Sequence, residues 1–209
     1  MSKESGLIYV PILHTRQEVN GIAHAGRPDA GPQTLSPTSV DYDRSVGEMW
    51  DGISRKIEEA NIVHSKVRIY QDAMPVCGME QDIAETLARQ GSRNHRLILD
   101  LIRKGAHLEG TEDPALLVQE YDALSALLAV ADRQNRAAFK DYQAKSAALM
   151  EKRDAFITDR IKSTVREGEL PLVFMGVRHR LDQRISSNFI ITFLIYRLPF
   201  RKIGDIYNV

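Results

Sequence analysis

The stretch LPLVFMGVRHRLD, residues 170–182, reads as a buried strand that runs into a glycine, a histidine and a group of charged residues. Gly176 lets the backbone bend where the strand ends, and His179 follows one turn later. A single histidine at a strand end is most often a surface residue. The role of His179 therefore depends on whether other strands deliver polar groups to the same place.

Strand signals recur at residues 7–13, 66–70 and 106–109, and segments with helical periodicity separate them. Pro11 in the first of these predicts an edge position or a bulge for that strand. Apolar residues recur at helical spacing over residues 45–61 and 80–89, which predicts two amphipathic helices. Ser92 is suited to cap a third helix. This alternation predicts a single α/β domain over residues 1–209, with a largely parallel sheet and flanking helices.

Three segments depart from that regular alternation. Residues 20–45 are rich in glycine and proline and are predicted to form an irregular loop. Residues 186–209 form an atypical aromatic and apolar tail, which we expect to be either a closing pair of strands or an irregular end. Residues 115–167 contain neither glycine nor proline, which favours a long helical segment before the last motif strand.

A single helix over residues 115–167 would be about 80 Å long. A domain of this size has a radius of gyration of about 17 Å. We therefore expect this segment either to break near residues 132–136 or to project as an arm. An arm of this kind offers a surface for a partner or for a homo-oligomer.

The predicted strands place polar side chains at one edge of the sheet. His14 ends the first strand, Asp72 follows the second, Glu112 follows the third, and His179 follows the last. Ligands of parallel sheets bind in the crevice beyond the carboxyl ends of the strands. The sequence therefore predicts a functional site at this edge.

Several motifs carry a resemblance to a known group of proteins: VPILH at the first strand, GTED after the third, the Arg153–Asp154 pair and VFMGVRH at the last strand. Together they resemble the hydrolase superfamily that includes TraB, TIKI, erythromycin esterase and ChaN proteins, and in particular an uncharacterised bacterial and archaeal branch. The departures are Pro11 in place of a glycine, Asp72 in place of a glutamate, and Asp154 where asparagine is common.

The resemblance implies a hydrolase that acts on a small molecule or a peptide. His14, Asp72, Glu112, Arg153 and His179 are its candidate catalytic residues. Two histidines and one or two carboxylates suit a divalent metal such as Zn²⁺ or Mn²⁺, so His14, His179 and either Asp72 or Glu112 are the candidate ligands. Arg153 would orient a substrate carboxylate or a developing oxyanion. A metal-free alternative uses His14 as the base.

Each of these residues also has a simpler structural interpretation. Glu112 lies in a helix N-terminal sequence, where acids favour the dipole, and Asp72 is suited to start a turn. Arg153 and its neighbour would fit a solvated helix face. Two further functions therefore stay open: a non-catalytic protein that binds haem or a peptide on the same fold, and a helical interaction protein.

Composition limits the partners. The chain has 28 basic and 28 acidic residues, and a net charge of zero disfavours nonspecific binding to nucleic acid or to an anionic membrane. The longest apolar run, residues 189–196, is far shorter than the roughly 20 residues that span a bilayer. The single cysteine and the absence of a secretory signal pattern lead us to expect a cytoplasmic protein.

Overall fold

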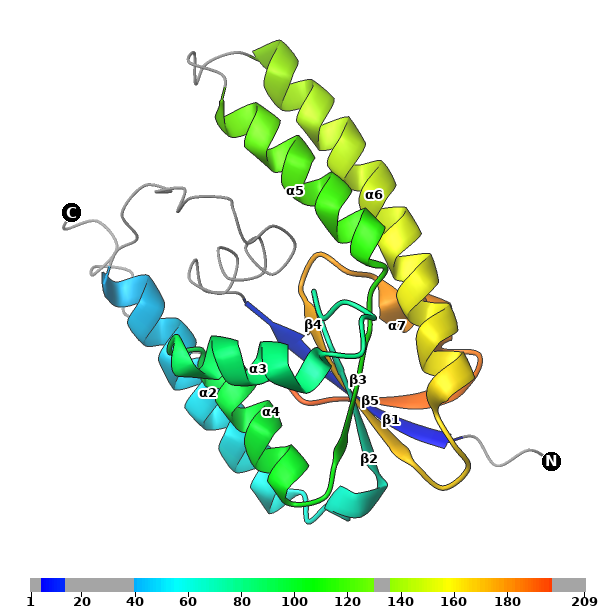
Figure 1. The fold of residues 1–209 in the computed structure, drawn as a ribbon. Helices are drawn as coiled ribbons and strands as arrows, with labels where there is room; N and C mark the ends of the chain where they lie inside the picture. The colour runs from blue at the N-terminus through cyan, green and yellow to red at the C-terminus, as the bar shows by residue number, and fades with distance from the viewer. Residues whose placement is uncertain (1–4, 14–39, 130–135, 197–209) are drawn as a thin grey trace, which may run out of the picture.

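A computed structural model of the chain describes residues 5–13, 40–129 and 136–196 (Figure 1). The strands are β1 (Ser5–Ile12), β2 (Val67–Gln71), β3 (His107–Glu109), β4 (Leu170–Gly176) and β5 (Phe189–Phe193). The helices are α2 (Val40–Glu59), the short 3-10 helix His64–Lys66, α3 (Glu80–Arg89), α4 (Arg93–Arg103), α5 (Pro114–Leu128), α6 (Arg136–Thr164) and α7 (Leu181–Ile185). His14 and residues 20–39 of the predicted loop lie outside these ranges.

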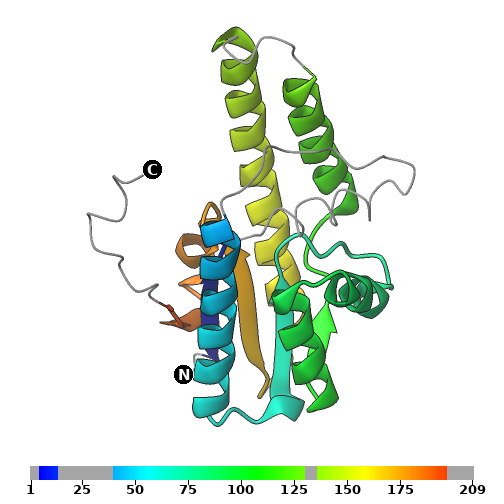
Figure 2. The same ribbon diagram turned by 90° about the vertical axis from the view of Figure 1, so that its left-hand side faces the viewer.

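The strands form one parallel sheet in the order β3-β2-β4-β1-β5. This confirms the predicted α/β fold with a parallel sheet. Strand β4, which contains the stretch quoted first, lies at the centre between β2 and β1. Figure 2 shows the sheet with β5 and β3 at its two margins.

Strand β1 is an interior strand, so the edge position predicted from Pro11 is wrong. Residues Ser5 to Tyr9 of β1 pair with β5, whereas Pro11 lies beyond the end of that pairing. On its other side Pro11 is in register with Met175 of β4. A proline is tolerated here because its missing N–H is not required by the shorter neighbour β5.

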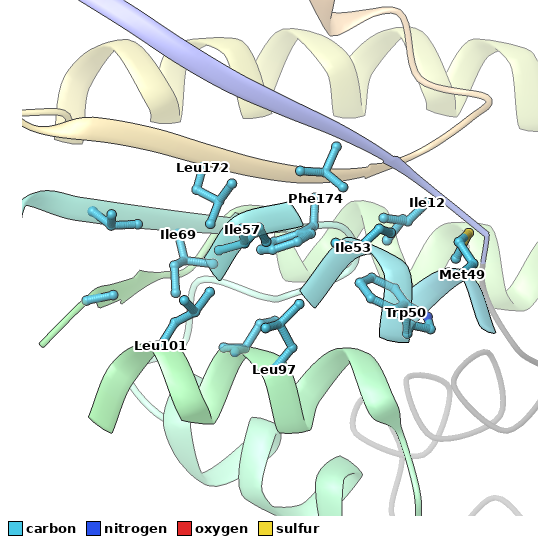
Figure 3. Packing of buried hydrophobic residues seen from close by; sticks show 14 of the residues in the cluster. Ile12, Met49, Trp50, Ile53, Ile57, Ile69, Leu97, Leu101, Leu172 and Phe174 are labelled. Atoms are coloured by element: carbon cyan, nitrogen blue, oxygen red, sulfur yellow. The ribbon is translucent and has the colours of Figure 1, made fainter. Parts of the chain in front are cut away.

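Helices cover both faces of the sheet. On one face α2 and α4 pack against β1, β2 and β4, and Trp50 lies with its ring centroid 6.0 Å from that of Phe174 (Figure 3). On the other face α6 and α7 pack against alternate residues of the same strands, such as Tyr9 and Val173. Burial on both faces explains why β2 and β4 are apolar along most of their length.

The long segment predicted over residues 115–167 consists of two helices. Helix α5 begins after Asp113, whose side chain accepts a hydrogen bond from the N–H of Ala115 at 2.8 Å. Helices α5 and α6 lie side by side and extend beyond the carboxyl ends of the strands (Figures 1 and 2). The segment thus forms a helical hairpin that projects from the sheet. Among the described residues, no helix has the length and apolar character needed to cross a bilayer.

A charged cluster fixes the C-terminal part of α6 to strands β2 and β3. Arg68 of β2 is 3% exposed and donates two hydrogen bonds to Glu169, at 2.6 and 2.7 Å, and one to Glu109. Arg160 of α6 donates to the same Glu109 at 2.9 Å. The hydrogen bonds from Arg68, together with the N–H of Arg166, lower the pKa of the Glu169 carboxyl to about 2.

The depressed pKa predicts an acid-sensitive contribution to stability. The unfolded carboxyl titrates near 4.5, so Glu169 stabilises the fold above that pH, and its contribution is lost as the pH falls through about 2. We expect wild type to exceed Glu169→Gln in free energy of unfolding at pH 7, with the difference vanishing between pH 4.5 and 2. Urea unfolding across this range measures it, with the exposed Glu167→Gln as control. A difference that stays constant down to the lowest pH would contradict the prediction.

Candidate functional site

The carboxyl ends of β2, β3 and β4 bring together four of the five residues predicted from the sequence. Asp72, Glu112, Arg153 and His179 are all buried, with exposed fractions of 6%, 0%, 5% and 7%. The fifth, His14, lies outside the described residues. After β2 the chain reaches α4 on one face of the sheet, and after β4 it reaches α7 on the opposite face. In parallel sheets, ligands bind beyond the strand ends where neighbouring connections diverge in this way.

Asp72 is held by the end of β4. Its N–H donates to the carbonyl of Phe174 at 2.9 Å, which extends the pairing of β2 with β4 by one residue. Its Oδ2 accepts a hydrogen bond from the N–H of Gly176 at 2.9 Å. The second oxygen, Oδ1, is directed toward Arg153 and His179. The predicted alternative, a simple turn residue, does not account for these contacts with β4.

Glu112 is fixed by the loop that follows β2. The carbonyl of Met74 accepts the N–H groups of Thr111 and Glu112, both at 2.9 Å, and the N–H of Val76 donates to the carbonyl of Glu112. Asp113, not Glu112, caps helix α5. The Glu112 carboxylate therefore does not cap the helix, and it is buried against Arg153.

The backbone between Asp72 and Met74 is strained. Ala73 has a φ of +61°, in the left-handed region that a residue with a Cβ rarely adopts. Its N–H donates to Oε1 of Glu112 at 2.6 Å, which holds this conformation in place. Non-glycine residues in such conformations are concentrated at functional sites.

At Gly110 the loop that follows β3 packs closely against the loop that follows β2. A Cβ at this position would lie 2.7 Å from Cα of Val76 and 2.6 Å from Oε1 of Glu80. The N–H of Val76 donates to the backbone carbonyl of Glu112, so a shift of Val76 would disturb the backbone that positions this site residue. The loops are thus packed to the limit that a glycine allows.

We expect Gly110→Ala to lower the free energy of unfolding by about 1–3 kcal/mol, the usual cost of overpacking. Gly6→Ala is the matched control, because no atom lies within 4 Å of a Cβ built there. Urea denaturation of both variants measures the effect. Equal stability of the two variants would show that the loops adapt without cost.

Arg153 links three carboxylates. It donates to Glu112 through Nε at 2.5 Å and through Nη2 at 2.7 Å. Nη2 also donates to Oδ1 of Asp72 at 2.9 Å, and Nη1 donates to Glu120 of α5. Burial alone would lower the pKa of Arg153, but the hydrogen bonds and charges of these acids raise it above its usual range, so the guanidinium is charged. This arrangement favours a role in holding carboxylates over the predicted role in orienting substrate.

His179 lies between two aspartates. Its Nδ1 is 2.5 Å from Oδ1 of Asp154, and its Nε2 is 3.3 Å from Oδ1 of Asp72. Asp154 also accepts the N–H of Arg180 at 3.1 Å, which fixes its second oxygen. Burial lowers the pKa of His179, but the charge of Asp72 and the hydrogen bond to Asp154 raise it to about 10. The imidazole is therefore protonated on both nitrogens at neutral pH.

Among the described residues, the site brings four carboxylates together with two cationic side chains. Asp72, Glu112, Asp154 and Glu120 contact Arg153, His179 or both. Burial raises the pKa of Glu112, although Arg153 opposes this effect. A site with excess buried carboxylate is relieved either by protons or by a cation.

The residues present fit a metal ion. Asp72, Glu112 and His179 each offer a ligand atom, and these atoms lie within 4.8 Å of one another. These are three of the four metal ligands predicted from the sequence. Asp154 contacts the other ring nitrogen of His179, Nδ1. A carboxylate in this position is a usual partner of a metal-binding histidine. The group could therefore hold a metal ion. Asp72 and Glu112 would then contact both the ion and Arg153.

Two contributors were absent from the predicted site. Asp154 is 2% exposed and contacts His179, and Glu120 completes the environment of Arg153 from helix α5. The Arg153–Asp154 pair was visible as a motif, but nothing in the sequence distinguished Asp154 from a solvated helix residue. Glu120 has no comparable signal.

Comparison of the chain with protein-family models, with curated proteins and with solved structures found no match. The resemblance to the TraB, TIKI, erythromycin esterase and ChaN superfamily therefore stays a prediction from short motifs. The class that the fold and site define is an α/β protein with a buried histidine, arginine and carboxylate cluster at the carboxyl edge of its sheet.

Proposed function

We propose that the chain is a metal-dependent hydrolase of carboxylic esters or peptides, with Zn²⁺ or Mn²⁺ held by Asp72, Glu112 and His179. The observation that carries the proposal is the contact of Asp154 with Nδ1 of His179, which leaves Nε2 facing the two other candidate ligands. Carboxylate oxygen and imidazole nitrogen are the donors that these ions prefer in proteins.

A divalent ion in this position would polarise a carbonyl oxygen and lower the pKa of bound water toward about 7. The residues of the chain supply the remaining requirements. Asp154 fixes the orientation of the His179 ring through Nδ1, and Arg153 holds Asp72 and Glu112 together despite their charge. Because the ligand nitrogen must be unprotonated, binding of the ion requires loss of the proton from Nε2.

Metal analysis and hydrolysis assays test the proposal together. We expect the purified protein to bind one ion of Zn²⁺ or Mn²⁺, to hydrolyse a panel of nitrophenyl esters or short peptides, and to lose this activity on chelation and regain it on metal addition. His179→Ala should lose both the ion and the activity. His107→Ala is the matched control, because His107 is 62% exposed and lies at the amino end of β3, away from the carboxyl ends that form the site.

The results also separate the alternatives. Hydrolysis that survives chelation would overturn the metal dependence and favour the metal-free mechanism. Binding of haem or a peptide without turnover, lost in His179→Ala, would favour a non-catalytic binding protein. A protein that neither binds metal nor hydrolyses any member of the panel would contradict the proposed function.

The helical hairpin supports a second candidate function, that of an interaction protein. None of the described side chains of α5 is fully buried, although the helix is mostly apolar, and Phe139 of α6 is 53% exposed. Apolar side chains in this state are typical of a surface that another molecule covers. Replacing Phe139 and Leu124 by serine should then weaken capture of that partner while leaving metal binding unchanged.

A further inference from the structure

The two edges of the sheet differ in how they are protected. Edge strand β3 has three residues, and its Glu109 is paired with Arg68 and Arg160. In the part of the chain that the structure describes, no ion pair of this kind protects edge strand β5. Residues 188–196 contain no charged side chain, and Ile190, Phe193 and Ile195 are 56%, 47% and 54% exposed. Exposed apolar edge strands without charges pair readily with other chains.

The outer side of β5 presents unpaired backbone groups. The N–H of Leu194 donates to the carbonyl of Tyr9 in β1, so Leu194 and the alternate residues before it face inward. Phe189, Ile191 and Phe193 therefore direct their N–H and carbonyl groups outward. Within the described part of the chain, these outward groups have no hydrogen-bond partner.

A second copy of the same strand complements this edge. If two β5 strands meet in antiparallel orientation about a two-fold axis at Ile191, Ile191 faces its own counterpart and Phe189 faces Phe193 of the second copy. These are the residues with outward backbone groups, so each pair can exchange two hydrogen bonds. A charged strand would place like charges opposite each other in such an arrangement, whereas β5 is uncharged.

We propose that β5 is a self-association edge, through which two copies of the chain join their sheets into one continuous sheet. The occupant is a second copy rather than a charged peptide, because the strand offers no charge for such a peptide to match. The contact is isologous, and it is built from a short strand. It should therefore give a reversible dimer whose population depends on concentration. This inference is independent of the proposed hydrolase function.

Sedimentation velocity over a concentration series tests the proposal with a charged variant. Wild type should shift from monomer to dimer as its concentration rises, and Ile190→Lys should raise the dimer dissociation constant at least about tenfold, since edge lysines block pairing. Val63→Lys, at a 61% exposed residue directly before the 3-10 helix His64–Lys66, is the matched control and should behave as wild type. A wild type that stays monomeric, or an Ile190→Lys variant that dimerises normally, would overturn the proposal.

A proline pair tests the backbone contact separately from the side chains. Ile191→Pro removes an outward N–H, so it should abolish dimerisation while the circular dichroism spectrum of the monomer is kept. Thr192→Pro removes an N–H that faces β1, so it should weaken the fold of the monomer itself. Undiminished dimerisation of Ile191→Pro would exclude strand pairing at this edge, whatever the result for Ile190→Lys.

Discussion

Replacing Arg153 by methionine is expected to lower the free energy of unfolding by about 3–5 kcal/mol, the usual cost of removing one partner of a buried ion pair. The variant leaves Asp72 and Glu112 buried with no guanidinium to offset their charges. Because domains of this kind are stable by only about 5–15 kcal/mol, this is a large fraction of the total. Guanidinium chloride denaturation measures the change.

Two controls separate this effect from the loss of an arginine in general. Arg184→Met removes a partly exposed partner of the exposed Glu151 and should cost no more than about 1 kcal/mol. Glu112→Gln combined with Arg153→Met should recover part of the loss, because it removes a buried charge that the single variant leaves unpaired. Equal costs for Arg153→Met and Arg184→Met would contradict the role assigned to Arg153.

Asp154→Asn should weaken metal binding by about 10–100-fold, the usual effect of losing the partner that orients a histidine ligand. In the metal-free protein the same change should lower the pKa of His179 from its value of about 10, since the hydrogen bond to Asp154 is one of the effects that raise it. A raised histidine pKa stabilises the fold below the unfolded value of about 6.5, and that stabilisation is lost as the pH rises through 10.

Calorimetric titration with Zn²⁺ or Mn²⁺ and NMR titration of the His179 ring measure the two effects. Asp159→Asn is the matched control, because Asp159 lies on the same helix with its side chain exposed. A variant in which the ring titrates as in wild type would show that Asp154 does not act on His179. Unchanged metal affinity with an altered ring pKa would instead place the ion away from His179.

The sequence was sufficient to predict most elements, because each has a local signal. Helix α4 is capped by Ser92 as expected, and Gly105, with a φ of +104°, follows its end. The order of the strands has no local signal, since connections of this length allow a strand to join the sheet beside any of several neighbours. Strand β5 was not predicted as a parallel edge strand, because an aromatic and apolar run of this length suits several structures.

The candidate site was predictable only as far as the rule for strand ends applies. Asp72, Glu112 and His179 follow strands directly, and the rule places them together. Asp154 lies on a helix next to Arg153, and the sequence of α6 does not show that its buried face is wide enough to include both. In the structure both are buried on the face that also contains Ile157, Thr158 and Ile161.

The central place of β4 has a consequence for synthesis on the ribosome. Strand β1 pairs only with β4 and β5, and β2 pairs only with β3 and β4, so no ladder joins the two halves of the sheet until β4 is present. β4 spans residues 170–176, near the end of the described chain. A nascent chain therefore holds β1 without a described strand partner until residues 170–176 have been synthesised. Folding of the sheet and assembly of Asp72 with His179 then occur together, as one cooperative step that waits for β4.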